Sequence, residues 1–329
     1  MSDRRRLLTF CTGILLVFLA LELLVRFNAT AFEAATSTGL AKAALCEKRP
    51  RVDMLFLGTS RTQDGVSPGL MTRAFSEMGP GHPEWEGFNV AFSGASLGDL
   101  MALGPRLSSR GGLKVAVIEV SEPQIQNRPP AWERLADPPP GIEGKLESWV
   151  KAVRLIRYRS AFLPDNIGRL PAMILFSGSL EGWETKGIDQ VASWLGFKPK
   201  PATGFVPGLW SPPVIAPAQT AVRLAPDLEE VATRYADLAR GFRAHGVRVV
   251  LAVPPLAKDL RSAPERGALK PFLAEVARRS ECELWDYAAL DLPDGLFKNS
   301  SHLGREGRAH FSKALAIQIA AKFGQGEGK

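Results

Sequence analysis

The sequence predicts an α/β fold: a three-layer α/β/α sandwich around a five-stranded parallel sheet. Short apolar runs of strand length alternate along the chain with longer amphipathic stretches of helix length. The connections between the runs are long enough for the crossovers that parallel pairing requires. Such alternation favours helices on both faces of one sheet. The five strands are expected at 52–57, 87–92, 115–120, 247–253 and 282–286.

Length and composition indicate one large globular domain. The chain has 329 residues, of which 45% are hydrophobic and 23% charged, so it can bury a full core. Its formal net charge of +7 raises the question of nucleic-acid binding. However, the arginines are scattered among acids, and no dense basic run alternates with aromatics. We therefore expect no nucleic-acid partner.

The amino terminus predicts a membrane anchor. Residues 7–25 form a mainly apolar run that follows the three arginines Arg4 to Arg6. This pattern is typical of a single-pass helix with its amino terminus in the cytoplasm, which would place the rest of the chain at the periplasmic or extracellular face. We accordingly assign 1–27 to a cytoplasmic tip and anchor, and 28–50 to a juxtamembrane linker. A cleaved signal peptide is the alternative, because Ala29-Thr30-Ala31 offers a small-x-small site.

The first strand leads into the stretch around which the chain is organised. Strand 52–57 stops at Gly58, and a polar run with Ser60 near its head precedes a helical pattern that begins near Pro68. A strand, a tight turn and a helix place Ser60 at the carboxyl end of the sheet, where open α/β sheets hold their ligands. The alternative for Ser60 is a plain helix-capping serine.

The next two strands continue the alternation. Strand 87–92 ends in the Ser- and Gly-rich segment 93–96, a helix is expected at 97–108, and strand 115–120 is β-branched and apolar throughout. The pattern then changes at 123–225, which is rich in proline and tryptophan. We interpret that segment as an insertion or lid within a single domain at 51–325. Its tryptophans either line a substrate groove or form a small core of the insertion itself.

Regular alternation returns in the last third of the chain. An amphipathic helix at 227–245 closes at Gly246, and strand 247–253 ends in two prolines. The remaining helices are expected at 264–279 and 306–323. Cys46 and Cys282 either pair in an oxidising compartment or remain free. No Cys/His spacing suggests a metal site, and we expect no metal and no cofactor.

Polar residues at the carboxyl ends of these strands suggest nucleophilic catalysis. A serine nucleophile needs a base within hydrogen-bond reach, and His302, in the turn before the last helix, can occupy the same rim as Ser60. The amides of Ser60 and Gly94 are suited to bind a developing oxyanion. Arg61, Asn89 and Ser121, which lie within or shortly after the first three expected strands, are the candidate substrate-binding residues.

Three blocks of sequence resemble the SGNH/GDSL hydrolases, whose sheet is flavodoxin-like. Gly58-Thr59-Ser60 looks like the first block, and Asn89 to Gly94 resembles the second, whose glycine supplies an oxyanion amide. The segment from Asn299 to Gly304 resembles the last block, in which an acid stands three residues before the histidine. The resemblance covers roughly 50–125 and 225–325 and leaves the insertion unexplained.

Two positions depart from that pattern. The acid position holds Asn299, and the third block, usually glycine-x-asparagine, reads Glu-Val-Ser-Glu-Pro from residue 119. An amide oxygen can orient a histidine by accepting its Nδ1 proton, but it cannot stabilise the imidazolium by charge. Asp291 or Asp294 would take over that role if their loop folds back.

The resemblance implies an extracytoplasmic serine esterase or O-acyltransferase that acts on acyl groups of envelope polysaccharide or lipid. Thr59-Ser60-Arg61 and the predicted anchor look most like membrane-attached members, such as proteins of alginate O-acetylation and lipoteichoic-acid D-alanylation. Ser60, His302 and Asn299 would form the catalytic set. The alternative is a catalytically retired protein of the same fold, which binds glycan or assembles with other envelope-modification proteins.

Overall fold

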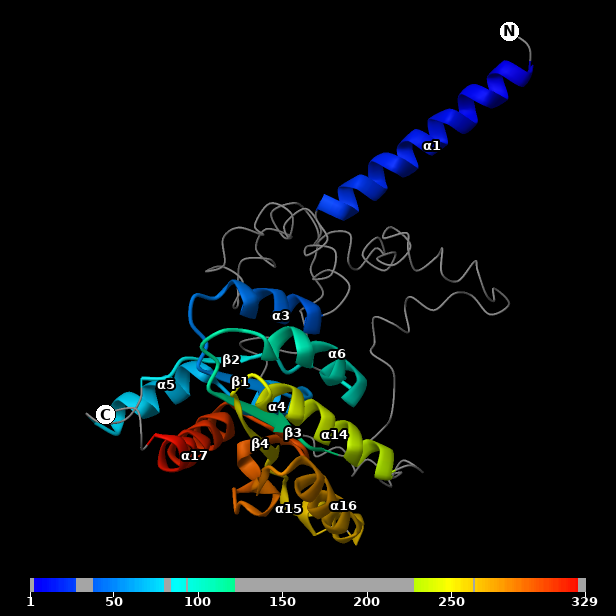
Figure 1. Cartoon of the computed structure of the whole chain (residues 1–329). Coiled ribbons are helices and arrows are strands. Elements are labelled where there is room, and N and C mark those ends of the chain that lie inside the picture. Colours follow the sequence, from blue (N-terminus) through cyan, green and yellow to red (C-terminus); the bar gives the residue numbers. More distant parts are fainter. Residues whose placement is uncertain are drawn as a thin grey trace. The chain divides into compact units, whose positions relative to one another are not determined.

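The structure is a computed structural model that describes residues 3–27, 38–79, 84–92, 94–121, 228–262 and 264–324 (Figure 1). The Pro/Trp-rich insertion predicted at 123–225 lies outside the described residues. The chain divides into two compact units, Met1–Ala44 with Ala131–Val206 and Leu45–Pro130 with Pro207–Lys329. The second unit contains the sheet and every candidate site residue.

A five-stranded parallel sheet forms the centre of the second unit, which confirms the predicted α/β class. The strand order is β2-β1-β3-β4-β5, with every neighbouring pair parallel. The strands are β1 (Met54–Leu57), β2 (Gly87–Asn89), β3 (Val115–Glu119), β4 (Arg248–Val253) and β5 (Glu283–Asp286). Strand β2 is shorter than the 87–92 expected. All residues of β1 and β3 are buried, because helices cover both faces of the sheet.

Helices cover the sheet in two layers. On one face α5 packs against α17, and on the other α14 packs against both α6 and α16 (Figure 1). The helices of the second unit are α4 (Ser60–Gly65), α5 (Pro68–Glu77), α6 (Leu97–Ser108), α14 (Leu228–Arg243), α15 (Lys258–Arg261), α16 (Pro264–Ser280) and α17 (Arg305–Phe323). Short 3₁₀ turns lie at Tyr287–Ala289 (η3) and Asp294–Leu296 (η4).

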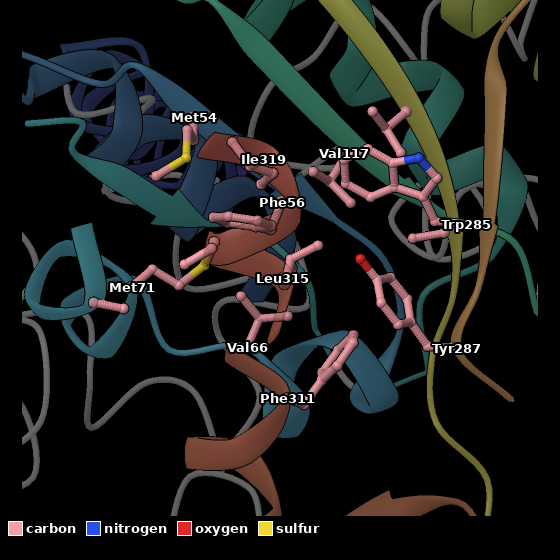
Figure 2. Packing of buried hydrophobic residues seen from close by; sticks show 14 of the residues in the cluster. Met54, Phe56, Val66, Met71, Val117, Trp285, Tyr287, Phe311, Leu315 and Ile319 are labelled. Atoms are coloured by element: carbon pink, nitrogen blue, oxygen red, sulfur yellow. The ribbon is translucent and has the colours of Figure 1, made fainter. Parts of the chain in front are cut away.

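The core beneath α5 and α17 follows the period-two alternation of the strands. Met54 and Phe56 of β1 and Val117 of β3 point to the same side, where they meet Phe311 and Leu315 of α17 (Figure 2). These side chains are almost completely removed from water. Burial of apolar area at about 25 cal/mol per Å² is the main force that fixes α17, and with it the loop that precedes α17, against the sheet.

One element near the site was not predicted. Residues ahead of α17 form an antiparallel hairpin of β6 (Phe297–Asn299) and β7 (His302–Leu303), in which Asn299 pairs with His302. The sequence indicated only a turn here, because strands of two and three residues are too short for a period-two pattern. We call this element the histidine hairpin.

The amino-terminal segment is helical, as α1 (Asp3–Phe27), and α3 (Thr38–Lys48) lies in the stretch predicted as a linker. Within the described ranges, no helix combines the length and the apolar character that crossing a membrane requires. The transmembrane anchor expected at 7–25 is thus not supported. Placement of the domain outside the cytoplasm stays a prediction.

The suggested pairing of Cys46 with Cys282 is not formed, since both thiols are free. Cys46 is fully buried in α3, and burial raises the pKa of its thiol to about 12. A thiol in that state is a poor nucleophile and behaves as a small apolar side chain.

Candidate active site

The turn that follows β1 holds Ser60 at the carboxyl end of the sheet. Gly58 ends the strand, Thr59 caps α4 in an extended conformation, and Ser60 is the first residue of that helix. The Thr59 hydroxyl accepts from the Arg61 amide at 3.2 Å, which satisfies one of the amides that a helix start leaves unpaired. Ser60 itself is half-buried, so its hydroxyl remains reachable at the rim of the sheet.

The structure brings Ser60, His302 and Asn299 into one chain of hydrogen bonds. The Ser60 Oγ lies 2.7 Å from Nε2 of His302, and Nδ1 of the same ring lies 2.8 Å from Oδ1 of Asn299. The backbone amides of Ser301 and His302 also donate to this Oδ1, at 3.1 and 2.9 Å. Two amide donors identify that atom as the oxygen of the side chain, so the imidazole must donate to it from Nδ1. Nε2 is therefore unprotonated and accepts the Ser60 hydroxyl proton.

Contacts with the loop after β4 hold the histidine hairpin in place. The Ala257 amide donates to the Ser300 carbonyl at 3.0 Å, and the Ser300 hydroxyl donates to Asp259 at 2.5 Å. These bonds hold Ser300, which lies between Asn299 and His302. The geometry of the hairpin then follows from two regular elements, β4 and α17, rather than from a free loop.

The two aspartates considered as replacement acids lie in other contacts. Asp294 accepts from the Lys258 amide at 3.1 Å, at the start of α15, and Asp291 pairs with Arg261 at 3.1 Å. Both carboxylates therefore bind residues of α15 and stabilise the loop that contains them. The structure places Asn299 at Nδ1 of His302, and the expectation that Asp291 or Asp294 takes this position is not met.

The environment of His302 favours the neutral ring. Burial is the main cause that lowers the pKa of His302 below its ordinary value, and the positive charges of Lys298 and Arg61 act in the same direction. The carboxylates of Asp64 and Glu119 oppose this shift. At neutral pH the imidazole is therefore uncharged, with a proton on Nδ1 and none on Nε2, which is the state a general base needs.

The first turn of α4 leaves one backbone amide available. Around Ser60, the amides of Thr59, Arg61, Thr62 and Gln63 all donate to acceptors within the turn or to Glu119. Among the contacts of the described residues, the Ser60 amide has no acceptor. A free amide at a helix start is suited to hold an anion, as predicted for this position.

Gly94 lies in the loop that follows β2. Its φ of +76° is in the left-handed region, and no atom lies within 4 Å of where a Cβ would stand. The Phe92 amide donates to the Gly58 carbonyl at 3.2 Å, which ties this loop to the Ser60 turn. Use of the Gly94 amide as a second oxyanion donor stays a prediction.

Two of the three predicted substrate-binding residues have other partners. The Asn89 amide group donates to the carbonyls of Thr62 and Val66 at 3.0 and 2.9 Å, and its oxygen accepts from the Ala91 amide. Ser121 is buried, and its hydroxyl donates to Glu119 at 2.6 Å. These contacts show that both residues support the fold, and their contact with substrate stays a prediction. Arg61 is half-buried and lies close enough to His302 for its charge to affect the histidine pKa.

Glu119, the last residue of β3, is the site residue that the sequence interpretation missed. Its side chain is only 1% exposed and accepts hydrogen bonds from Thr59, Thr62 and Ser121. The available signal was an acid at the end of an otherwise apolar, β-branched strand. A buried carboxylate is costly without partners, so such a position indicates a specific set of donors.

Gly58 lets the Ser60 turn approach this carboxylate. A Cβ at residue 58 would overlap Oε2 of Glu119 and would lie 2.6 Å from Oγ1 of Thr62 and 2.7 Å from Cβ of Glu119. We expect Gly58→Ala to reduce the free energy of unfolding by about 1–3 kcal/mol, as overpacking does. Thermal or urea unfolding measures this change. Gly69→Ala is the control, since nothing lies within 4 Å of a Cβ there, and an equal loss in both variants would contradict the steric explanation.

The described residues contain no group of three or more His, Cys, Asp or Glu side chains arranged to hold a metal ion.

Comparison with known proteins adds little information about the function of this chain. No protein-family profile and no curated protein matches this chain. One solved structure, described as a putative acylhydrolase from Bacteroides fragilis NCTC 9343, aligns at 12% identity with a TM-score of 0.40, covering 85% of this chain and 94% of that chain. A likeness of this strength carries no argument about activity.

Proposed function

We propose that this chain is a serine esterase or acyltransferase with Ser60 as its nucleophile. One observation carries the proposal: the Ser60 hydroxyl lies 2.7 Å from Nε2 of a histidine whose Nδ1 is held at 2.8 Å by Asn299. A serine is a weak nucleophile unless an oriented base removes its proton, and this arrangement supplies both the base and its orientation. The three residues come from the start of α4 and from the histidine hairpin.

The reaction proceeds through an acyl-enzyme. Oγ of Ser60 attacks the acyl carbonyl carbon while its proton passes to Nε2 of His302. The carbonyl oxygen becomes an oxyanion beside the Ser60 amide, with the Gly94 amide as the second donor. The imidazolium then gives its proton to the leaving alcohol as the ester bond breaks. A water molecule, or the hydroxyl of an acceptor sugar, loses its proton to Nε2 and attacks the acyl carbon. The imidazolium then returns the proton to Oγ of Ser60 as the bond between Oγ and the acyl carbon breaks, which regenerates the free enzyme.

Acyl groups on envelope polysaccharide or lipid are the substrate class that the sequence resemblance supports. Hydrolase and transferase share every step up to the acyl-enzyme and differ only in the acceptor that resolves it. Asn299 orients the imidazole without adding charge, so the imidazolium is less stabilised than beside an aspartate, and turnover is slower.

A fluorophosphonate probe tests this proposal, because it phosphonylates only an activated serine. The serine oxygen displaces fluoride, so we expect the purified chain to gain the mass of one probe less HF, and the modified peptide to contain Ser60. Denatured protein is the control, since unfolding separates Ser60 from His302. Absence of labelling in the folded protein would support the alternative, a retired scaffold that binds glycan or partner proteins.

A further inference from the structure

We propose that Glu119 is the positioning residue of the nucleophile: its buried carboxylate fixes the turn that carries Ser60 and leaves the Ser60 amide as the available donor. This inference rests on the proposed function of Ser60. Glu119 would not touch substrate. It would act through Thr59 and Thr62, the two residues that flank the Ser60-Arg61 pair.

The carboxylate holds the turn through both of its oxygens. Oε2 accepts from the amide of Thr59 at 2.8 Å, from the amide of Thr62 at 3.2 Å and from the Thr62 hydroxyl at 2.6 Å. Oε1 accepts from the hydroxyls of Thr59 and Ser121, at 2.7 and 2.6 Å. Four of these five donors belong to Thr59 and Thr62 and therefore fix the turn on both sides of Ser60. Hydrogen bonds to a charged acceptor are among the strongest that a protein makes.

The same bonds select which amide stays available. The first amides of a helix have no partner within that helix and point toward any anion placed there. Glu119 takes the amides of Thr59 and Thr62, and the Thr59 hydroxyl takes that of Arg61. The Ser60 amide lies between them in sequence and is the one left for a substrate oxyanion. The arrangement therefore directs the helix start toward the reacting atom.

Glu119 has a rigid position because its backbone belongs to the central strand of the sheet. β3 is the central strand, and Glu119 pairs in register with Ala252 of β4. The Val120 amide donates to the Ala252 carbonyl at 2.8 Å, and the Tyr235 hydroxyl donates to the Glu119 carbonyl at 3.4 Å. Rigid support of this kind holds a catalytic group within the small tolerance that catalysis requires.

Two conservative substitutions separate a positioning role from a role of the negative charge. Glu119→Gln keeps the length of the side chain. Its oxygen can stay at the Oε2 position, while its NH₂ group faces the hydroxyls of Thr59 and Ser121, which can rotate to accept. Glu119→Asp keeps the charge but withdraws the carboxylate by one carbon–carbon bond, about 1.5 Å. Positioning predicts that the aspartate variant is the poorer enzyme.

We expect Glu119→Asp to lower kcat about 100-fold with KM changed less than about three-fold, because a displacement of about 1 Å in a reacting group costs that much. Glu119→Gln should retain kcat within about ten-fold of the parent. Fluorophosphonate labelling rates should follow the same order. A thermal unfolding midpoint recorded for each variant shows whether it is folded under the assay conditions.

Thr62→Val tests the same contact without altering Glu119, and applies even if Glu119→Asp fails to fold. It removes the 2.6 Å hydroxyl bond to Oε2 and should lower kcat about ten-fold at unchanged KM. Thr72→Val is its matched control, since the Thr72 hydroxyl donates to the carbonyls of Pro68 and Trp85 and makes no described contact with Glu119. Asp53→Asn is the control for Glu119→Gln, because Asp53 is also a buried carboxylate but lies at the opposite end of β1.

The outcomes distinguish this inference from the function on which it rests. A parent that is neither labelled nor active overturns both. A labelled parent with Glu119→Asp and Thr62→Val at parental kcat overturns only the role of Glu119. A Glu119→Gln variant more impaired than Glu119→Asp would assign the effect to charge and also overturn positioning. Loss of kcat in Glu119→Asp and Thr62→Val, with the Gln and control variants retained, supports it.

Discussion

Replacing Ser60 by alanine is expected to abolish ester hydrolysis and fluorophosphonate labelling while leaving the fold intact. The substitution removes the atom that attacks the carbonyl, and loss of one member of such a set lowers turnover by roughly 10⁴- to 10⁶-fold. The only hydrogen bond of the Ser60 hydroxyl among the described contacts is the one to His302. The free energy of unfolding should therefore change by less than about 1 kcal/mol.

Ser67→Ala is the matched control for this prediction. Ser67 also stands at the start of a helix in the same region, and its hydroxyl makes no capping bond. We expect parental hydrolysis, labelling and unfolding midpoint in that variant. Equal labelling of Ser60→Ala and the parent would remove Ser60 from the mechanism. A large drop in its unfolding midpoint would instead give Ser60 a structural role that its contacts do not suggest.

Ser60 and His302 were predictable from local patterns, and Asn299 from the resemblance of its segment to the last block of a known family. Gly58 and Ser60 follow an apolar strand and precede a helix, which determines both the turn and its place at the carboxyl end of the sheet. His302 and Asn299 are three residues apart before a helix with an apolar face. Their spacing fits a hairpin in which the two side chains meet.

The supporting contacts were not predictable, because they join segments far apart in the chain. Glu119 meets Thr59 across 60 residues of sequence, and this pairing exists only once β1 and β3 lie side by side. The same limit applies to the contacts of Asn89 and Ser121, while their role in substrate binding stays a prediction. Polar residues at strand ends resemble binding residues in sequence, and only their partners show that they satisfy buried groups.

The amino-terminal helix shows a different limit. An apolar run that follows arginines predicts a helix from local composition, and the helix is present. Whether that helix crosses a membrane is a separate question, and no membrane-spanning helix is found among the described residues.

Changing Asn299 to aspartate is expected to accelerate the enzyme by about ten-fold or more at pH 8. The oxygen at Oδ1 keeps its four donors, and none of the described hydrogen bonds depends on the Nδ2 group that is lost. The new charge stabilises the imidazolium that forms when Ser60 gives up its proton. Initial rates with a short-chain aryl ester, measured at saturating and limiting concentrations, give the change in kcat and in kcat/KM.

The pH dependence should change with the rate. In the parent, burial lowers the pKa of His302 below about 6.5, so activity should persist below pH 6.5 before protonation of the base removes it. A carboxylate at residue 299 favours the charged ring and raises that pKa. The acid limb of kcat/KM should therefore lie at higher pH in Asn299→Asp, and its advantage should shrink as the pH falls.

Asn299→Ala and Asp294→Asn complete the test. Alanine frees the ring at Nδ1, but the Ser301 hydroxyl lies 3.1 Å from that atom and can retain part of its orientation, so we expect a loss of roughly ten- to 100-fold. Asp294→Asn should have little effect, because its carboxylate holds the Lys258 amide instead. A severe loss there, with both Asn299 variants silent, would transfer the orienting role to Asp294. An inactive parent that gains activity only as Asn299→Asp would identify a retired scaffold, because the added charge would then be the missing part of the catalytic set.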